Sequence, residues 1–210
     1  MTWGYEGKSM TRKELSRNYW RYYRMLEDKF LSTANYVEIN PSNFSTYSNE
    51  YALLLHSIGA ELDNFFKVYC GFNLTDRKNI SDYVAFVLAD FPTITTEKLK
   101  VEGTDVEVTP FNGWNATTPA QSLTWWMAFD HIKHNRIDNF AEANQENVLN
   151  MLAALYLLEV KMFTKATEDD PAQGLAEVDI PSEDSRVFGL PTWNFRCISA
   201  DDLREIEKWA

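Results

Sequence analysis

Two long segments of this chain carry apolar residues at the spacing of an α-helix, and they constrain the fold more than any other feature. In residues 48–70 and again in 144–164, apolar side chains recur every three or four positions. A broad apolar stripe of this kind is typical of a central helix in a bundle. Asn144 is a favourable N-cap for the second segment, and Gly59 inside the first one indicates the close approach of a neighbour. The sequence therefore predicts a mainly α-helical fold.

Shorter patterns extend this prediction. Residues 11–31 begin with the capping-box spacing of Thr11 and Glu14, and a third helix is expected from Asn79 or Ser81 to Leu88. A further helix is expected over 124–135.

The remaining patterns are not helical. Alternating apolar residues around Gly103 predict a β-hairpin insertion near 97–110. Residues 166–186 are acidic and interrupted by Pro and Gly, which predicts a loop. An extended segment over 187–198 and a short helix over 200–209 are expected to follow.

The whole chain, 1–210, is expected to be a single domain. Residues 11–165 would form a bundle of four or five helices that carries the hairpin, and 166–210 would form a C-terminal strap.

Composition narrows the class of protein. No segment approaches the length of apolar run that spans a bilayer, and residues 1–10 lack the pattern of a secretory signal. The cysteines Cys70 and Cys197 are far apart and form no CxxC pair, which predicts free thiols. We therefore expect a cytoplasmic protein without a membrane partner.

The net charge of −11 argues against a protein coated for nucleic acid. The charge is uneven, because residues 1–35 have a net charge of +3 and residues 166–210 a net charge of −7. This unevenness leaves room for a local basic surface.

The common catalytic motifs are missing from the sequence. It contains no glycine-rich phosphate loop and no GxSxG nucleophile elbow. No histidine is preceded by a glutamate at the Glu-x-x-His spacing of di-iron bundles. The sequence predicts no cofactor.

One stretch, 125–136, concentrates groups that can do chemistry. His131 and His134 are three residues apart and share a helix face, as do Lys133 and Arg136. Such a cluster can hold a phosphate or a carboxylate, run acid–base chemistry, or cleave RNA without a metal. We take Lys133, His134 and Arg136 as candidate catalytic residues, and His131 as a candidate binding residue.

Two further residues join the candidate binding site. Trp126 lies in the same stretch, and Glu61 in the second helix is a candidate partner for Lys133 or Arg136, because a buried acid needs a paired cation. A structural interpretation stays open, since polar residues before a turn often cap a helix or pair with carboxylates. A metal site on the two histidines is not expected, because zinc needs further protein ligands.

Three segments together resemble a known family. They are 57–67 (SIGAELDNFFK), 125–136 (WWMAFDHIKHNR) and 147–156 (NVLNMLAALY), and in their layout they resemble bacterial proteins of the HEPN group, the higher eukaryotes and prokaryotes nucleotide-binding domain. The resemblance implies a HEPN-like helical bundle over 11–165, often dimeric. In many members it also implies RNA cleavage in toxin–antitoxin or phage-defence systems.

The active members of that group carry an Arg followed after a short spacing by a His. The corresponding positions after Arg136 hold Phe140, Ala141 and Glu142, and the histidines precede the Arg instead. We therefore expect a non-catalytic binding or dimerisation module, with a homodimer as the first partner. The alternative is a metal-independent ribonuclease or nucleotide-binding protein that uses Lys133, His134 and Arg136, with RNA, a nucleotide or an antitoxin as the partner.

Overall fold

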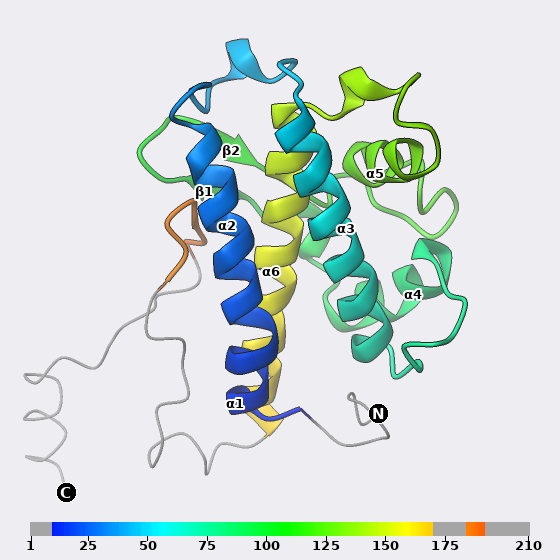
Figure 1. Cartoon of the computed structure of the whole chain (residues 1–210). Coiled ribbons are helices and arrows are strands. Elements are labelled where there is room, and N and C mark those ends of the chain that lie inside the picture. The colour runs from blue at the N-terminus through cyan, green and yellow to red at the C-terminus, as the bar shows by residue number, and fades with distance from the viewer. Residues whose placement is uncertain (1–9, 170–183, 192–210) are drawn as a thin grey trace, which may run out of the picture.

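The fold is mainly helical, with one small antiparallel sheet at its side (Figure 1). The computed structural model describes residues 10–169 and 184–191. The predicted mainly α fold class is confirmed at this level. The predicted helix over 200–209 lies outside the described residues.

The first helical run contains three consecutive pieces. They are α1 (Arg12–Leu15), a π-helical segment η2 (Ser16–Trp20) and α2 (Arg21–Thr33). The side chain of Thr11 caps the run by accepting a hydrogen bond from the backbone N–H of Glu14, and the Glu14 side chain accepts one from the backbone of Thr11. The predicted capping box is therefore present. The π-helical segment was not predicted; it brings Leu15 and Trp20, which are five residues apart, to the buried side of the run.

The next two helices begin at the capping residues that the sequence offers. Ser48 caps α3 (Asn49–Tyr69), and Asn79 caps α4 (Ile80–Asp90) through a second capping box. α4 ends before Pro92, as expected from the restriction that proline places on the residue before it.

The last long helix, α6 (Gln145–Asp169), lies at the centre of the molecule. It packs against α2, α3 and α5 (Thr124–Asn135). Every side chain from Met151 to Leu158 is buried, which is what a helix surrounded on all sides requires. A loop was predicted to begin at residue 166, but α6 continues to Asp169.

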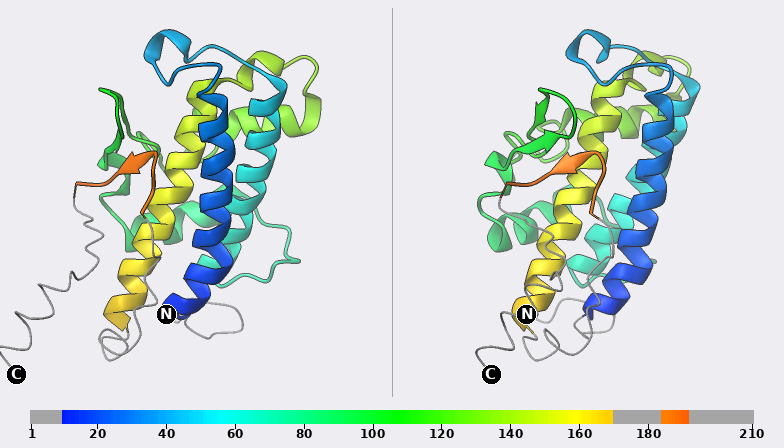
Figure 2. Two further views of the ribbon diagram at one scale, coloured as in Figure 1. Left: turned by 60° about the vertical axis from the view of Figure 1, so that its left-hand side comes forward. Right: turned by 90° about the vertical axis from the view of Figure 1, so that its left-hand side faces the viewer.

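The sheet lies on the side of α6 that faces away from α3 (Figure 2). Its strand order is β2 (Glu107–Val108), β1 (Leu99–Val101), β3 (Phe188–Gly189), and both pairs are antiparallel. β1 and β2 form the predicted hairpin, and Gly103 has a φ of 73° in the turn between them. The ring of Phe188 packs 5.7 Å from that of Tyr156, centroid to centroid, and so joins β3 to α6.

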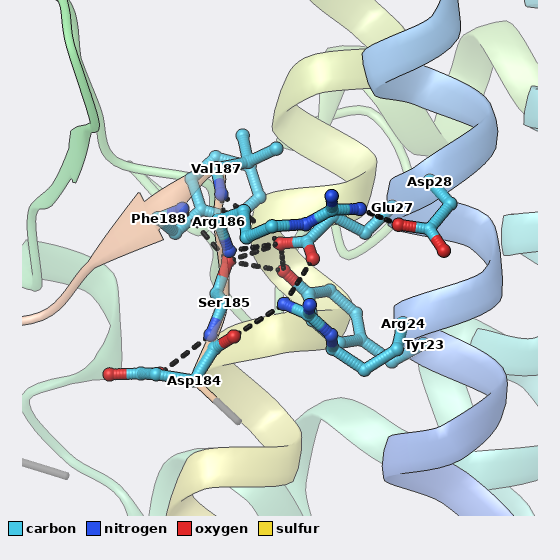
Figure 3. Close-up of polar contacts among 9 residues, drawn as sticks. All are labelled: Tyr23, Arg24, Glu27, Asp28, Asp184, Ser185, Arg186, Val187 and Phe188. Carbon is cyan, nitrogen blue, oxygen red and sulfur yellow. Dashed lines mark hydrogen bonds and ion pairs between the residues drawn. The ribbon is translucent and has the colours of Figure 1, made fainter. Parts of the chain in front are cut away.

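A buried carboxylate, Glu27 on α2, anchors the segment that leads into β3 (Figure 3). Its Oε1 accepts hydrogen bonds from the hydroxyl of Ser185 at 2.5 Å and from the backbone N–H of Arg186 at 2.9 Å and Val187 at 3.1 Å. Its Oε2 pairs with Arg24 at 2.5 Å. Because these donors surround one acid, the burial of Glu27 is fully compensated.

The sequence predicted free cysteine thiols and no segment that spans a membrane. Cys70 is a free, half-buried thiol, and Cys197 lies outside the described residues. Among residues 10–169 and 184–191, no helix has the length and apolar character needed to cross a membrane.

Candidate functional site: the surface at the end of α5

The helix that carries the candidate cluster is fixed to the core by its first turns. The indole N–H of Trp125 donates to the carbonyl of Pro110 at 2.6 Å. Trp126 is 8% exposed, and its ring makes T-shaped contacts with Phe66 and Phe129. Trp126 therefore packs in the hydrophobic core instead of lining the surface cluster.

Close packing also fixes the distance between α5 and α3. A Cβ atom added at Gly59 would lie 2.4 Å from the ring of Phe129, so only glycine permits this approach. The close neighbour that the sequence indicated at Gly59 is thus α5. The contact places the exposed end of α5 beside the first half of α3.

The two histidines of the cluster each face a carboxylate. His131 Nδ1 lies 2.9 Å from Oε2 of Glu142, which follows α5 in a short 3-10 turn (Phe140–Glu142). His134 Nε2 lies 3.4 Å from Asp130 Oδ1, one turn back on the same helix, and both of these side chains are more than half exposed. Neither histidine contacts Arg136 through a hydrogen bond within the described residues.

Lys133 and Arg136 lie over aromatic rings instead of carboxylates. Lys133 Nζ is 5.5 Å from the ring centroid of Phe129, and the guanidinium of Arg136 is 5.6 Å from that of Phe140. Arg136 also donates a hydrogen bond to Asn49 Oδ1 at 3.4 Å, at the start of α3. Both cations are exposed, and neither forms an ion pair with any acid in the described part of the chain.

Glu61 lies elsewhere in the bundle. It is half-buried on α3, and no hydrogen bond or ion pair within 10–169 joins it to Lys133 or Arg136. Burial raises the pKa of Glu61 to about 7. Its electrostatic neighbours are Tyr19 and Glu159. The structure thus brings four of the predicted residues to one end of α5 and leaves Glu61 and Trp126 in other surroundings.

Exposed apolar side chains lie on the same two segments as Arg136 and its hydrogen-bond partner Asn49. Leu53 is 60% exposed one turn after Asn49, Ile137 is 83% exposed next to Arg136, and Tyr47 is 52% exposed. The ring of Tyr47 contacts that of Phe140 edge-on, with centroids 5.4 Å apart. We call this surface the α3–α5 face; it contains Tyr47, Asn49, Leu53, His56, Lys133, Arg136, Ile137 and Phe140.

Sequence reasoning missed most of this face. The apolar pattern places Leu53 beside buried neighbours, and nothing in the pattern separates an exposed leucine from a core one. The one usable signal was Ile137, an isolated apolar residue among the polar residues of 133–139.

The face combines unpaired positive charge with apolar area and ring surfaces. Interfaces between proteins are enriched in aromatic residues and Arg, and adjoining exposed apolar side chains often mark a contact site. Within the described residues, no group of three or more His, Cys, Asp or Glu side chains is placed to hold a metal ion. The surface thus presents cations, rings and exposed apolar side chains together, which are the groups enriched at contact sites.

Comparisons with known proteins add no identification. The chain matches no protein-family model, no curated protein and no solved structure.

Proposed function

We propose that this chain is a HEPN-like binding and dimerisation module without catalytic activity, and that it uses the α3–α5 face for contact. The observation that carries the proposal is that Lys133 and Arg136, which form no ion pair in the described part of the chain, share the α3–α5 face with the exposed side chains of Leu53 and Ile137. An interface would bury this apolar area and could pair the two charges with acids of the partner.

A second copy of the chain is the first partner that fits. The surroundings of the face also carry exposed acids, among them Asp130 at 54% and Glu50 at the start of α3. In a two-fold symmetric dimer, the same patch meets itself, so that the cations of one copy can approach the acids of the other. An antitoxin or another protein of a phage-defence system would be a hetero-partner for the same face.

Sedimentation equilibrium tests the homodimer. We expect a mass of twice 24.4 kDa for the wild type and a monomer for the double variant Leu53→Asp/Ile137→Asp, because two buried charges oppose association. The matched control is Leu74→Asp, which changes an exposed leucine beyond the other end of α3 and should leave the dimer intact. A wild-type monomer at high concentration would overturn the homodimer proposal.

A second function is favoured by the cation–ring pairs. Lys133 and Arg136 offer charges for phosphates, and the half-buried ring of Phe140 beside Arg136 offers a surface on which a base can stack, as in proteins that bind single-stranded RNA. An assay with labelled RNA should then show binding that Lys133→Gln and Arg136→Gln weaken. Cleavage that His134→Ala abolishes would replace the non-catalytic proposal with the metal-independent ribonuclease.

A further inference from the structure

The α3–α5 face combines apolar and positively charged groups at the start of α3 and the end of α5. Leu53 and Ile137 are 60% and 83% exposed, and Lys133 and Arg136 form no ion pair within the described residues. A segment that fits this surface must supply apolar side chains with carboxylates beside them. An amphipathic helix with acidic borders has this combination and is a common way to cover such a face.

The chain itself contains such a segment, residues 198–210, which we call the tail segment. It lies outside the described residues, and its sequence predicts a helix over 200–209. Its large apolar side chains recur every three residues, at Leu203, Ile206 and Trp209. At 3.6 residues per turn these three fall within about one third of the circumference of a helix, and Glu205 and Glu207 border them on the two sides.

Charge favours contact between the tail segment and the α3–α5 face. The tail segment contains four acidic and two basic residues, which gives a net charge of −2. With its apolar stripe against Leu53 and Ile137, the helix would hold its two bordering glutamates beside Lys133 and Arg136. The apolar contact then supplies most of the affinity, and the charge pairs select the orientation.

The tail segment of the same copy is poorly placed to reach this face. β3 lies on the side of α6 that faces away from α3 (Figure 2), and the described chain after it ends at Pro191. The connecting residues, 192–199, span at most about 29 Å when fully extended. A straight line from β3 to the exposed side of α3 crosses two helices of about 10–12 Å each, and a path over a rounded surface is about one and a half times as long. A second copy is therefore the better source of the tail segment.

We propose that the tail segment of one copy binds the α3–α5 face of a second copy, and that two copies exchange their tail segments in this way. The inference rests on the proposed function, because it keeps this face as the contact and a second copy as the partner, and it names the part of that copy that is bound. A two-fold axis relates the two contacts, so that both faces are covered.

Sedimentation equilibrium of full-chain variants tests the exchange. Leu53→Asp/Ile137→Asp alters the face, and Leu203→Asp/Ile206→Asp alters the tail segment. We expect each variant to be monomeric alone, because burying the new carboxylates opposes the contact. An equimolar mixture should form dimers, since the tail of the face variant can bind the face of the tail variant. These dimers should be weaker than those of the wild type but at least about tenfold tighter than the self-association of either variant.

Arg204→Gln/Lys208→Gln is the matched control for the tail variant. Both double changes lower the net charge by two, but Arg204 and Lys208 lie opposite the apolar stripe of the predicted helix, so the control should remain a dimer. A tail variant that stays dimeric would overturn the exchange and leave the proposed homodimer in place. A mixture that stays monomeric would also overturn the exchange. A monomeric wild type would instead overturn the homodimer, and the exchange with it.

A labelled peptide measures the same contact directly. The probe is a fluorescein-labelled peptide with the sequence of residues 198–210, added to the full-chain tail variant, whose own tail no longer binds. We expect its fluorescence anisotropy to rise, and a peptide with Leu203→Asp to bind at least about tenfold more weakly. Adding Leu53→Asp to the protein should weaken the binding in the same way. Equal binding of the two peptides, or binding that ignores Leu53→Asp, would overturn the proposal.

Discussion

Two carboxyl groups, Glu61 on α3 and Glu159 on α6, are electrostatic neighbours, and neither forms an ion pair within residues 10–169 and 184–191. Glu159 is 1% exposed, and neither of its oxygens has a hydrogen-bond partner within the described residues. Burial, followed by the nearby Glu61, raises the pKa of Glu159 well above its usual value. Tyr19, from the π-helical segment, completes the group, and its own pKa is raised to about 12 by burial and by the two acids.

The raised pKa values predict that the protein loses stability as the pH rises. An unfolded glutamate ionises near pH 4.5, whereas Glu61 in the folded state ionises near pH 7. Between these values the folded state binds more protons than the unfolded state, so the free energy of unfolding falls with pH. Urea unfolding at a series of pH values should show this decline, and it should be shallower in Glu61→Gln.

Glu159→Gln sharpens the same test. The amide of the variant does not ionise. Its free energy of unfolding should therefore exceed that of the wild type at pH 8 and differ little from it at pH 4. Glu38→Gln, which changes an exposed glutamate, serves as the control and should follow the wild type at every pH. A variant that is less stable than the wild type at pH 8 would mean that Glu159 is ionised and has a partner.

At the scale of elements, Glu27 joins parts of the chain that are far apart in sequence. Ser185, Arg186 and Val187 all donate to it across about 160 residues, and the carbonyl of Val187 accepts from the N–H of Glu102 next to β1. One carboxylate therefore connects α2 directly to the segment that leads into β3 (Figure 3), and through Val187 to the hairpin.

Glu27→Gln should loosen this connection. An amide nitrogen placed opposite Arg24 turns an ion pair into two facing donors, which should cost roughly 2–4 kcal/mol of unfolding free energy. Hydrogen exchange should accelerate at the amides of Arg186, Val187 and Glu102. Asp28→Asn, which removes the exposed pair with Arg186, should cost less than about 1 kcal/mol. Unchanged exchange at Glu102 would show that Glu27 stabilises α2 alone.

Local patterns predicted the helices and the hairpin because their signals are local. Thr11, Ser48 and Asn79 begin helices by bonding N–H groups two or three residues away. Partners distant in sequence leave no such pattern. In the sequence, Glu27 looks like any exposed polar residue of a helix. Nothing in the sequence near Phe188 indicates that its strand pairs with β1. The candidate site divides in the same way. The helix over 124–135 was predicted from local spacing, whereas the contact of Arg136 with Asn49 depends on how α5 packs against α3.

At the scale of the whole molecule, the net charge of −11 opposes any association of two copies. The proposed dimer must overcome this repulsion with the apolar area of Leu53 and Ile137 and with charge pairing at Lys133 and Arg136. Binding of RNA would face the same global repulsion, but its local attraction would come from those two cations alone. The two proposals for the α3–α5 face therefore differ in their response to salt.

Raising the salt from 50 to 500 mM should strengthen the dimer and weaken RNA binding. At about 0.1 M salt the screening length is ~10 Å, so added salt suppresses repulsion between two acidic copies while the apolar contact is retained. RNA binding loses affinity with salt, because each neutralised phosphate releases counterions. Sedimentation equilibrium and RNA titration at both salt concentrations measure the two slopes. A dimer that dissociates at high salt would mean that ion pairs at Lys133 and Arg136, and not Leu53 and Ile137, hold the two copies together.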